Sequence, residues 1–389
     1  MTEIAPHVKV PFTRPDITRE DVEAVADAVR SGWLTTGPRV AEFERRFAEA
    51  AGAEHVVMLN SGTAALHLAL EAIGLRRGDE VVVPSLTFAA CAEVVCYFGA
   101  KPVFVDVRSA DHNIDPASLA SAIGPRTRAV MPVHFGGVPC DMDEILAICR
   151  PSGVAVIADS AHCFPSEYHG RQVGVLADIS CFSFYATKTI TTGEGGALAT
   201  ENAAWAERAR MMSLHGLSRD AWKRYAEGGS WYYEIAAAGY KYNMTDVAGA
   251  LGLSQLPRAQ AMRDSRERIA SRYDAEFERI DGFELLRTPS DRVNAHHLYV
   301  LKLRQAAFRI DRGRFIEELA ARGVATSVHF IPLHLQPFYR QFARREIGLA
   351  VTDDVWSRSV SLPIHSGMAD IEVETVVSAV LELARLHAR

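Results

Sequence analysis

Residues 55–74 read HVVMLNSGTAALHLALEAIG and contain a strand, a turn and a helix in one short stretch. His55 to Leu59 is an apolar run of strand length, and Thr63 to Ile73 has helical periodicity that ends at Gly74. Only Asn60-Ser61-Gly62 joins the two. Such a unit, in which a strand leads directly into a helix, is typical of α/β proteins.

The same alternation continues through the first two thirds of the chain. Near-continuous apolar strands are typical of a mostly parallel sheet that helices cover on both faces. The sequence therefore predicts an α/β fold around such a sheet. Further strands are predicted at Val81 to Val83, Val103 to Val107, Ala129 to Val133, Val154 to Ala158, Ile179 to Phe184 and Ala197 to Thr200.

The pattern changes after about residue 250. Arg258 to Ile280 predicts a long, highly charged helix with a solvated face and an apolar stripe. Leu298 to Leu303 predicts a strand, and Ile371 to Leu386 predicts a final helix. We expect a large α/β domain over residues 1–255, including an N-terminal arm, and a smaller C-terminal α+β domain over residues 256–389.

Composition excludes several classes of protein. The chain has 389 residues, of which 48% are hydrophobic and 23% are charged, as in globular proteins and unlike disordered, collagen-like or coiled-coil chains. The net charge of −6 provides no large positive field, so neither nucleic acid nor an anionic membrane is an expected partner. An anionic ligand must therefore be held by a local site.

The N-terminus and the cysteines indicate a cytoplasmic protein. Met1 to Phe12 has no apolar core, so no signal peptide is predicted. No stretch reaches the roughly 18 uninterrupted apolar residues of a membrane helix. The six cysteines are too sparse for a disulfide scaffold, and no pair has the C-x-x-C spacing of a zinc ribbon. We expect most of them to be buried free thiols, and we expect no metal site.

Common catalytic signatures are absent from the sequence. It contains no G-x-x-x-x-G-K-[ST], no H-E-x-x-H and no G-x-S-x-G, and no G-x-G-x-x-G follows a strand. These absences argue against a P-loop protein, a zincin, a hydrolase of the G-x-S-x-G type and a simple dinucleotide-binding protein.

Polar residues instead follow three predicted strands, at the strand ends where open α/β sheets place their ligands. Gly62 lets the backbone approach a ligand, and the free amides of the next helix suit a phosphate, although an ordinary N-cap is the alternative. Asp159 ends a buried run, where a carboxylate needs a cation, unless it serves as a helix cap or in a structural ion pair. Lys188 follows another buried run, where an amine becomes nucleophilic, unless it snorkels to solvent.

These three positions together suit one cofactor. Pyridoxal phosphate needs a lysine that forms a Schiff base and an aspartate that keeps the pyridine nitrogen protonated. It also needs a cradle for its phosphate. Lys188, Asp159 and the turn at Gly62 offer these groups at neighbouring strand ends.

The chain resembles the DegT-type nucleotide-sugar aminotransferases, fold-type I enzymes that depend on pyridoxal phosphate. The resemblance extends from about Val10 to Leu386 and rests on eight segments in the same order. They are SGWLTTGP (31–38), SGTAAL (61–66), TF (87–88), DSAH (159–162), FSFYATK (182–188), GEGG (193–196), GYKYNMTD (239–246) and VHFIPLH (328–334).

The resemblance implies roles for individual residues. Lys188 would carry the cofactor as a Schiff base and move the proton, and Asp159 would pair with the pyridine nitrogen. The other implied cofactor-binding residues are Phe88, which would stack on the ring, Gly62, Thr63 and Ser183, which would hold the phosphate, and Asn243, which would reach that phosphate from the partner subunit. A homodimer with shared active sites follows from the last assignment.

Three positions depart from the pattern of the family. His162 stands where many members have Gln to bond the phenolic oxygen of the cofactor, and a histidine can still donate that bond. Tyr185 stands where His is frequent, and its hydroxyl would face the sugar. Thr189 stands where Asn is common. These departures concern sugar specificity more than the reaction.

The implied reaction has two stages. L-Glutamate gives its amine to the cofactor, and the resulting pyridoxamine phosphate aminates a nucleotide-linked keto sugar. Residues 215–225 and 241–243 look more like members that aminate carbon 4, which suggests a dTDP- or UDP-4-keto-6-deoxyhexose. Residues expected to face the substrate are Thr35, Tyr185, Arg219 and His329. Arg219, with Lys223 and Arg224, offers three cations to a diphosphate, or else forms a solvated loop.

Other readings remain open at this point. An aminotransferase could act on a 3-keto sugar or on a cyclitol ketone. A dehydratase of the same family is another alternative, but that branch replaces the lysine with histidine. A regulatory protein that merely keeps the fold is disfavoured by the intact Lys188 and Asp159.

Overall fold

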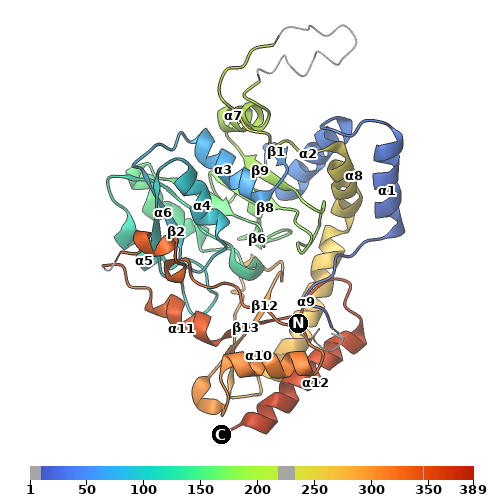
Figure 1. The fold of residues 1–389 in the computed structure, drawn as a ribbon, viewed down its shortest axis with the longest axis vertical. Coiled ribbons are helices and arrows are strands. Elements are labelled where there is room, and N and C mark those ends of the chain that lie inside the picture. The colour runs from blue at the N-terminus through green and yellow to red at the C-terminus, as the bar shows by residue number, and fades with distance from the viewer. Residues whose placement is uncertain (1–9, 218–232, 345) are drawn as a thin grey trace, which may run out of the picture.

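The computed structural model describes residues 10–217, 233–344 and 346–389 (Figure 1). Its largest element is a seven-stranded sheet in the order β1-β9-β8-β5-β4-β2-β3. Only β9 runs antiparallel to its neighbours, so the predicted mostly parallel sheet is confirmed. The strands are β1 (His55–Leu59), β2 (Glu80–Pro84), β3 (Lys101–Val105), β4 (Thr127–Val130), β5 (Ala155–Asp159), β8 (Ile179–Ser183) and β9 (Gly196–Thr200).

Helices cover both faces of this sheet. One face packs on α2 (Pro38–Ala51), α5 (Pro116–Ala122) and α6 (Met142–Cys149). The other face packs on α3 (Gly62–Ala72), α4 (Ala90–Tyr97) and α7 (Ala203–Ser213). Along β1, Val56 and Met58 enter the first core and Val57 and Leu59 enter the second. Because side chains alternate along a strand, a strand buried on both faces must be apolar throughout.

The C-terminal part forms a second core around a three-stranded sheet in the order β10-β12-β13. Figure 1 shows α10 and α12 on the far side of this sheet from the large one. Val10, near the start of the described chain, pairs with Val324 and joins this core. The elements are β10 (Phe283–Leu285), β12 (Tyr299–Leu303), β13 (Ser359–Leu362), α9 (Ala259–Phe277), α10 (Arg312–Ala321), α11 (Ala350–Arg358) and α12 (Asp370–His387). The domain boundary at residue 255 stays a prediction.

Two further sets of contacts involve a short three-stranded sheet, which joins the two parts, and a pair of helices within the larger part. The strand β11 (Arg292–Val293) pairs with β6 (Glu167–Tyr168), which pairs with β7 (Arg171–Gln172). The helix α1 (Arg19–Arg30) packs on α8 (Asp246–Gln255).

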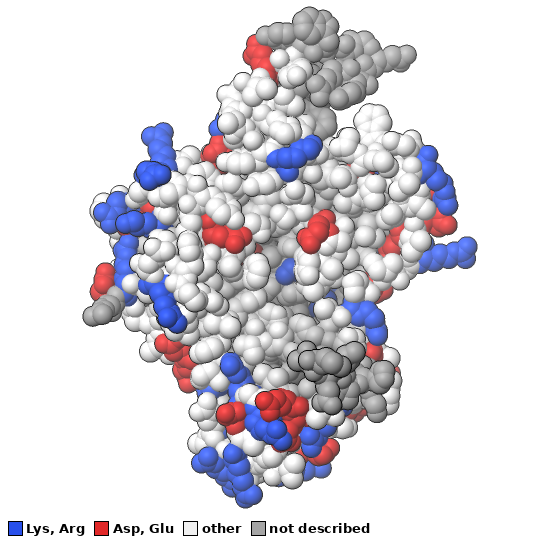
Figure 2. Space-filling model, in the orientation of Figure 1, with Lys and Arg blue, Asp and Glu red and all other residues white. Residues whose placement is uncertain are grey.

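The surface in Figure 2 carries positive and negative side chains interspersed, with no large area of one sign on that face. None of the described helices combines the length and apolarity needed to cross a bilayer.

The long charged helix differs from its prediction at one residue. α9 has the expected apolar stripe, which includes Met262, Ile269 and Tyr273. Arg266 lies on the same stripe and is only 2% exposed, so one of the predicted surface charges is buried. Its guanidinium donates hydrogen bonds to the backbone carbonyls of His297 (3.4 Å) and Ile364 (3.0 Å).

Candidate active site

Most of the predicted site residues line one cavity of about 440 Å³. It lies where β5 and β8 end. These two strands are parallel neighbours, so their carboxyl ends meet at the same edge of the sheet. The predicted residues that line it are Gly62, Thr63, Phe88, Asp159, His162, Ser183, Tyr185, Lys188 and His329. The fold therefore brings together segments that lie far apart in the sequence.

The turn before α3 forms one wall of the cavity. Ser61 caps the helix, since its hydroxyl accepts a hydrogen bond from the Ala64 amide at 3.0 Å. The N-cap reading is thus correct for Ser61, while Gly62 and Thr63 still face the cavity. A Cβ at Gly62 would lie 3.0 Å from the Cβ of Ser183. Gly196 packs behind the turn so closely that a Cβ there would lie 2.3 Å from the Ser61 carbonyl oxygen.

Asp159 is a buried carboxylate with weak partners. It is 7% exposed, and its Oδ1 accepts a hydrogen bond from the Ala161 amide at 2.9 Å. Its Oδ2 accepts a hydrogen bond from the thiol of Cys91 at 3.0 Å. Within the described part of the chain, no cationic side chain forms an ion pair with Asp159. A buried carboxylate in this state fits a cationic ligand group in the cavity.

Lys188 projects into the same cavity rather than to the protein surface. Burial, helped by repulsion from Arg266, lowers the pKa of its amine to about 8, although Asp159 acts in the opposite direction. No hydrogen bond or ion pair joins this amine to the described residues. A desolvated amine in this state is nucleophilic toward a carbonyl carbon.

Three histidines surround the lysine. The ring of His162 stacks on that of His297, with centroids 4.3 Å apart. His329 Nδ1 shares a hydrogen bond with the hydroxyl of Ser361 at 2.8 Å. Burial and the positive charge of Lys188 lower the pKa of His329 to about 4 and those of His162 and His297 well below the usual value. All three rings are therefore neutral near neutral pH.

His297 was missed by the sequence analysis. It lines the cavity but belongs to none of the motifs that resemble the family. The one available signal was its place directly before the predicted strand at 298–303. Because β12 belongs to the smaller sheet, only the tertiary arrangement brings His297 beside His162.

Aromatic side chains form the rim of the cavity. Phe88 is 60% exposed, and its ring centroid lies 5.9 Å from that of Phe330. Tyr185 is 46% exposed. These rings present apolar faces to whatever enters the cavity, and the predicted stacking of Phe88 on a cofactor stays a prediction.

Among the described residues, two predicted site residues, Thr35 and Asn243, do not line this cavity. Asn243 donates a hydrogen bond from its side-chain amide to the hydroxyl of Thr36 at 2.7 Å, beside Thr35. Asn243 also forms a β-bridge with Leu59, at the end of β1. Arg219, like Lys223 and Arg224, lies outside the described residues.

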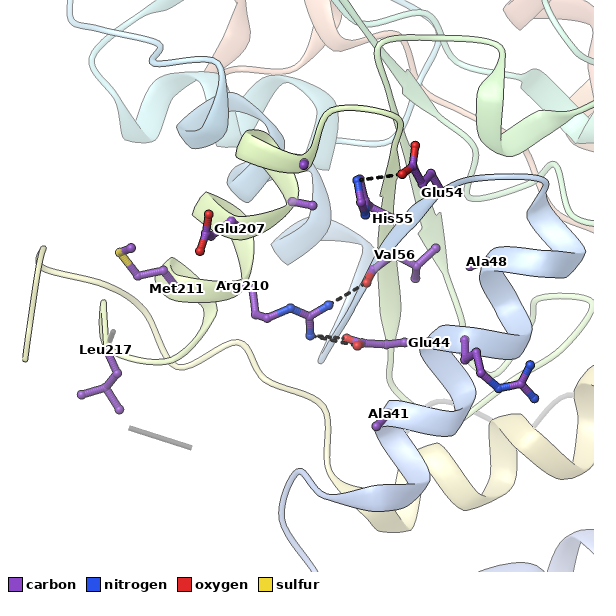
Figure 3. A pocket seen from close by; sticks show the side chains of 13 residues that line it. Ala41, Glu44, Ala48, Glu54, His55, Val56, Glu207, Arg210, Met211 and Leu217 are labelled. Atoms are coloured by element: carbon purple, nitrogen blue, oxygen red, sulfur yellow. Dashed lines mark hydrogen bonds and ion pairs between the residues drawn. The ribbon is translucent and has the colours of Figure 1, made fainter. Parts of the chain in front are cut away.

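A second cavity of about 410 Å³ lies between α2, β1 and α7 (Figure 3). There Arg210 donates hydrogen bonds to the carboxylate of Glu44 and to the Val56 carbonyl. The Glu44 carboxylate also accepts a hydrogen bond from the Met58 amide at 2.9 Å. None of the predicted site residues lines this cavity, and its central ion pair is already satisfied.

Comparison with known proteins agrees with this geometry. The model of the DegT/DnrJ/EryC1/StrS aminotransferase family matches residues 15–381. The spore coat polysaccharide biosynthesis protein SpsC of Bacillus subtilis is 44% identical, over 97% of this chain and 97% of its own length. The uncharacterized protein MJ1066 of Methanocaldococcus jannaschii is 45% identical, over 96% of this chain and 97% of its own.

Solved structures of aminotransferases share the fold of this chain. The PMP form of the putative sugar aminotransferase Spr1654 from Streptococcus pneumoniae has a TM-score of 0.91 at 32% identity, covering 97% of this chain and 100% of that one. Spr1654 is also known in PLP and apo forms. PseC of Helicobacter pylori, an aminotransferase involved in the biosynthesis of pseudoaminic acid, has a TM-score of 0.89 at 29% identity, covering 97% and 99%.

Proposed function

Because the chain belongs to the DegT/DnrJ/EryC1/StrS aminotransferase family, we propose that it transfers the amino group of L-glutamate to a nucleotide-linked keto sugar. It is a pyridoxal-phosphate-dependent sugar aminotransferase, as its family and structural neighbours are. The observation that carries the proposal is the convergence of Lys188 and Asp159 on one cavity, where neither has a charged partner in contact among the described residues.

Pyridoxal phosphate supplies, when bound, a carbon that accepts amino groups and a ring that takes up electrons from the bond broken in the donor. The residues of the cavity fit this group. Asp159 lacks the cation that a protonated pyridine nitrogen provides, and the start of α3 offers free backbone amides to a phosphate. Gly62, Thr63 and Ser183 would hold that phosphate, and Phe88 would cover the ring.

The residues around Lys188 make it the acid–base group of the reaction. With a pKa of about 8, its amine is partly neutral near neutral pH and can accept a proton from the donor's α carbon. The neighbouring Arg266 and the low polarity of the cavity keep the amine from being fully protonated. Positioned proton transfer of this kind is worth roughly 10²–10⁴ in rate.

Asp159 acts through its charge. Its two hydrogen bonds, from Ala161 and Cys91, fix the carboxylate without neutralising it. A fixed negative charge at the edge of the cavity would hold a proton on the pyridine nitrogen. His162, neutral and with one edge on the cavity, would donate to the phenolic oxygen.

For the acceptor, we propose carbon 4 of a dTDP- or UDP-4-keto-6-deoxyhexose, with a 3-keto sugar or a cyclitol ketone as the alternative. The rim residues Phe88, Tyr185 and His329 offer stacking faces and hydrogen bonds to a sugar. Arg219 would meet the diphosphate, and Thr35 would contribute from the segment beside Asn243. An intact Lys188 disfavours a dehydratase.

The position of amination is tested with matched acceptors. The 4-keto and 3-keto isomers of one nucleotide sugar are each incubated with enzyme and L-glutamate, and the new amine is located by NMR. We expect amination of the 4-keto isomer with release of 2-oxoglutarate. Amination of only the 3-keto isomer would overturn the carbon-4 assignment, and failure with every keto sugar would overturn the proposed acceptor class.

We further propose a homodimer with shared active sites. Asn243 lies outside its own cavity, on a segment bonded to the stretch that carries Trp33 and Leu34. Those two side chains are 45% and 51% exposed, which leaves apolar surface beside Asn243 for a second subunit. A cytoplasmic location remains our proposal as well, and the six cysteines, all free thiols, are compatible with a reducing compartment.

A further inference from the structure

The ring of His162 is held by other rings rather than by hydrogen bonds. Its centroid lies 4.3 Å from that of His297, at 30° between the planes, and 6.1 Å from that of Phe330, at 18°. Its Nδ1 is buried and has no hydrogen-bond partner among the described residues. The orientation of this ring in the cavity therefore depends on packing.

The backbone of His297 is held by a hydrogen bond from α9. His297 is 7% exposed, and its backbone carbonyl accepts a hydrogen bond from the buried guanidinium of Arg266 at 3.4 Å. The same guanidinium donates a hydrogen bond to the carbonyl of Ile364 at 3.0 Å. Arg266 on α9 therefore links the segment at His297 to the segment at Ile364. His297 lies just before β12 of the smaller sheet, whereas His162 lies in the turn that follows β5 of the large sheet.

The charges nearby keep both rings neutral. Lys188 and Arg266 are the positively charged groups that act on His297, and burial disfavours a further charge. Two neutral imidazoles can stack without repulsion. Nδ1 of His162 meets neither a donor nor an acceptor among the described residues, and a buried N–H without an acceptor is rarer than a buried lone pair without a donor, so we expect a neutral His162 to carry its proton on Nε2.

We propose that His297 is a positioning residue, which fixes the plane of His162 and keeps its Nε2–H aimed at an acceptor oxygen of the cofactor. This inference rests on the proposed function, since it takes the phenolic oxygen of pyridoxal phosphate as that acceptor. Stacking does the positioning, and hydrogen bonding by the His297 ring contributes nothing to it.

The test uses two substitutions that separate stacking from hydrogen bonding. His297→Phe keeps an aromatic face, and His297→Gln keeps polar atoms but loses the ring. Binding of pyridoxal phosphate is titrated by absorbance and fluorescence. We expect the Kd of the Phe variant to stay within about twofold of wild type and that of the Gln variant to rise roughly three- to tenfold, with a shifted absorbance maximum.

His169→Asn is the matched control. His169 also stacks on an aromatic ring, that of Tyr168 at 4.1 Å, but does not line the cavity. Its removal leaves the Kd unchanged. The proposal is overturned if the Gln variant binds like wild type, or if the Phe variant loses binding as strongly as the Gln variant does.

A measurement without cofactor tests the His162 ring directly, and its wild-type arm does not depend on how the variants fold. Imidazole ¹⁵N shifts of the full cofactor-free chain report which nitrogen of His162 carries the proton, with His162→Gln used for assignment. We expect the Nε2–H form in wild type and a mixture in His297→Gln. A proton on Nδ1 in wild type overturns the inference, whereas failure of wild type to bind pyridoxal phosphate contradicts the proposed function.

Discussion

The thiol of Cys91, on α4, donates a hydrogen bond to Oδ2 of Asp159, at the end of β5, at 3.0 Å. Cys91 is fully buried, and burial beside a carboxylate raises the pKa of its thiol well above the usual value. The thiol therefore stays protonated and remains a donor. Thr87 contacts the same sulfur, with its hydroxyl 3.3 Å away. A cysteine predicted only as a buried free thiol thus supports the central carboxylate of the site.

Removing this donor should destabilise the protein. Cys91→Ala leaves one oxygen of a buried carboxylate without its partner, which costs about 1–3 kcal/mol of the free energy of unfolding. Cys91→Ser keeps a donor and should lose less. Urea unfolding of the cofactor-free protein measures both. Cys181→Ala is the control, because Cys181 is equally buried near Asp159 but makes no hydrogen bond to it. Equal losses for Cys91→Ala and Cys181→Ala would mean that the hydrogen bond contributes nothing.

Lys188 should reduce the stability of the cofactor-free protein. Its amine is desolvated and has no partner in contact within the part of the chain that the structure describes. Lys188→Met should therefore abolish turnover yet raise the free energy of unfolding near neutral pH, by at most ~3 kcal/mol. The folded pKa of about 8 lies below the ordinary value of 10.5. The burial cost is therefore fully present below about pH 8 and disappears towards pH 10.5, so the gain from Met should shrink over that range.

Lys302→Met is the contrasting variant. Lys302 is fully buried, but its amine donates to the Ser109 carbonyl at 2.6 Å and pairs with Glu284. Its removal takes a donor from the Ser109 carbonyl and from the Glu284 carboxylate, so this variant should be destabilised. Chemical unfolding between neutral and alkaline pH measures both variants. Destabilisation by Lys188→Met would contradict the assignment of its amine as unpaired.

Gly196→Ala should distort the turn at the start of α3. The new Cβ would lie 2.3 Å from the Ser61 carbonyl oxygen and 2.6 Å from the Gly62 amide nitrogen, so backbone must move. We expect at least a tenfold weaker binding of pyridoxal phosphate, measured by titration of the cofactor-free protein. Gly124→Ala is the control, because a Cβ at Gly124 meets nothing within 4 Å. Unchanged binding by Gly196→Ala would show that the turn does not hold the phosphate.

Mixed subunits should test the proposed sharing of active sites. Lys188→Ala and Asn243→Ala are each expected to be inactive, and subunit exchange at equal amounts should restore about a quarter of wild-type activity. The reason is that half of the random dimers are hybrids, and each hybrid has one site with both residues intact. Activity is measured before and after exchange. No recovery, despite hybrids seen by native mass spectrometry, would place Asn243 and Lys188 in the same subunit's site or in no common site.

Much of the fold could be predicted from local patterns. The apolar run at His55–Leu59 became β1 with the expected bounds, and that at 154–158 became β5 within one residue at each end. The sequence did not predict the short strand β13 or the helix α11, because SVSL and AVTDDVWSR lack a clear period. Strands of this kind can be predicted because a strand that is buried on both faces must be apolar along its whole length.

Lys188 and Asp159 could be proposed from sequence because Asp159 ends a buried strand, Lys188 lies in the segment after another, and strand ends converge at one edge of a parallel sheet. The sequence by itself thus determined the fold class and predicted Lys188 and Asp159 as the two central groups of the candidate site. It did not determine their surroundings. Cys91 lies 68 residues from Asp159, and Arg266 lies 31 residues from His297. Contacts at such separations depend on strand order, in which β5 lies between β4 and β8, and on how the smaller core docks. No local period encodes that order, so only the tertiary structure decided which side chains hold the site in place.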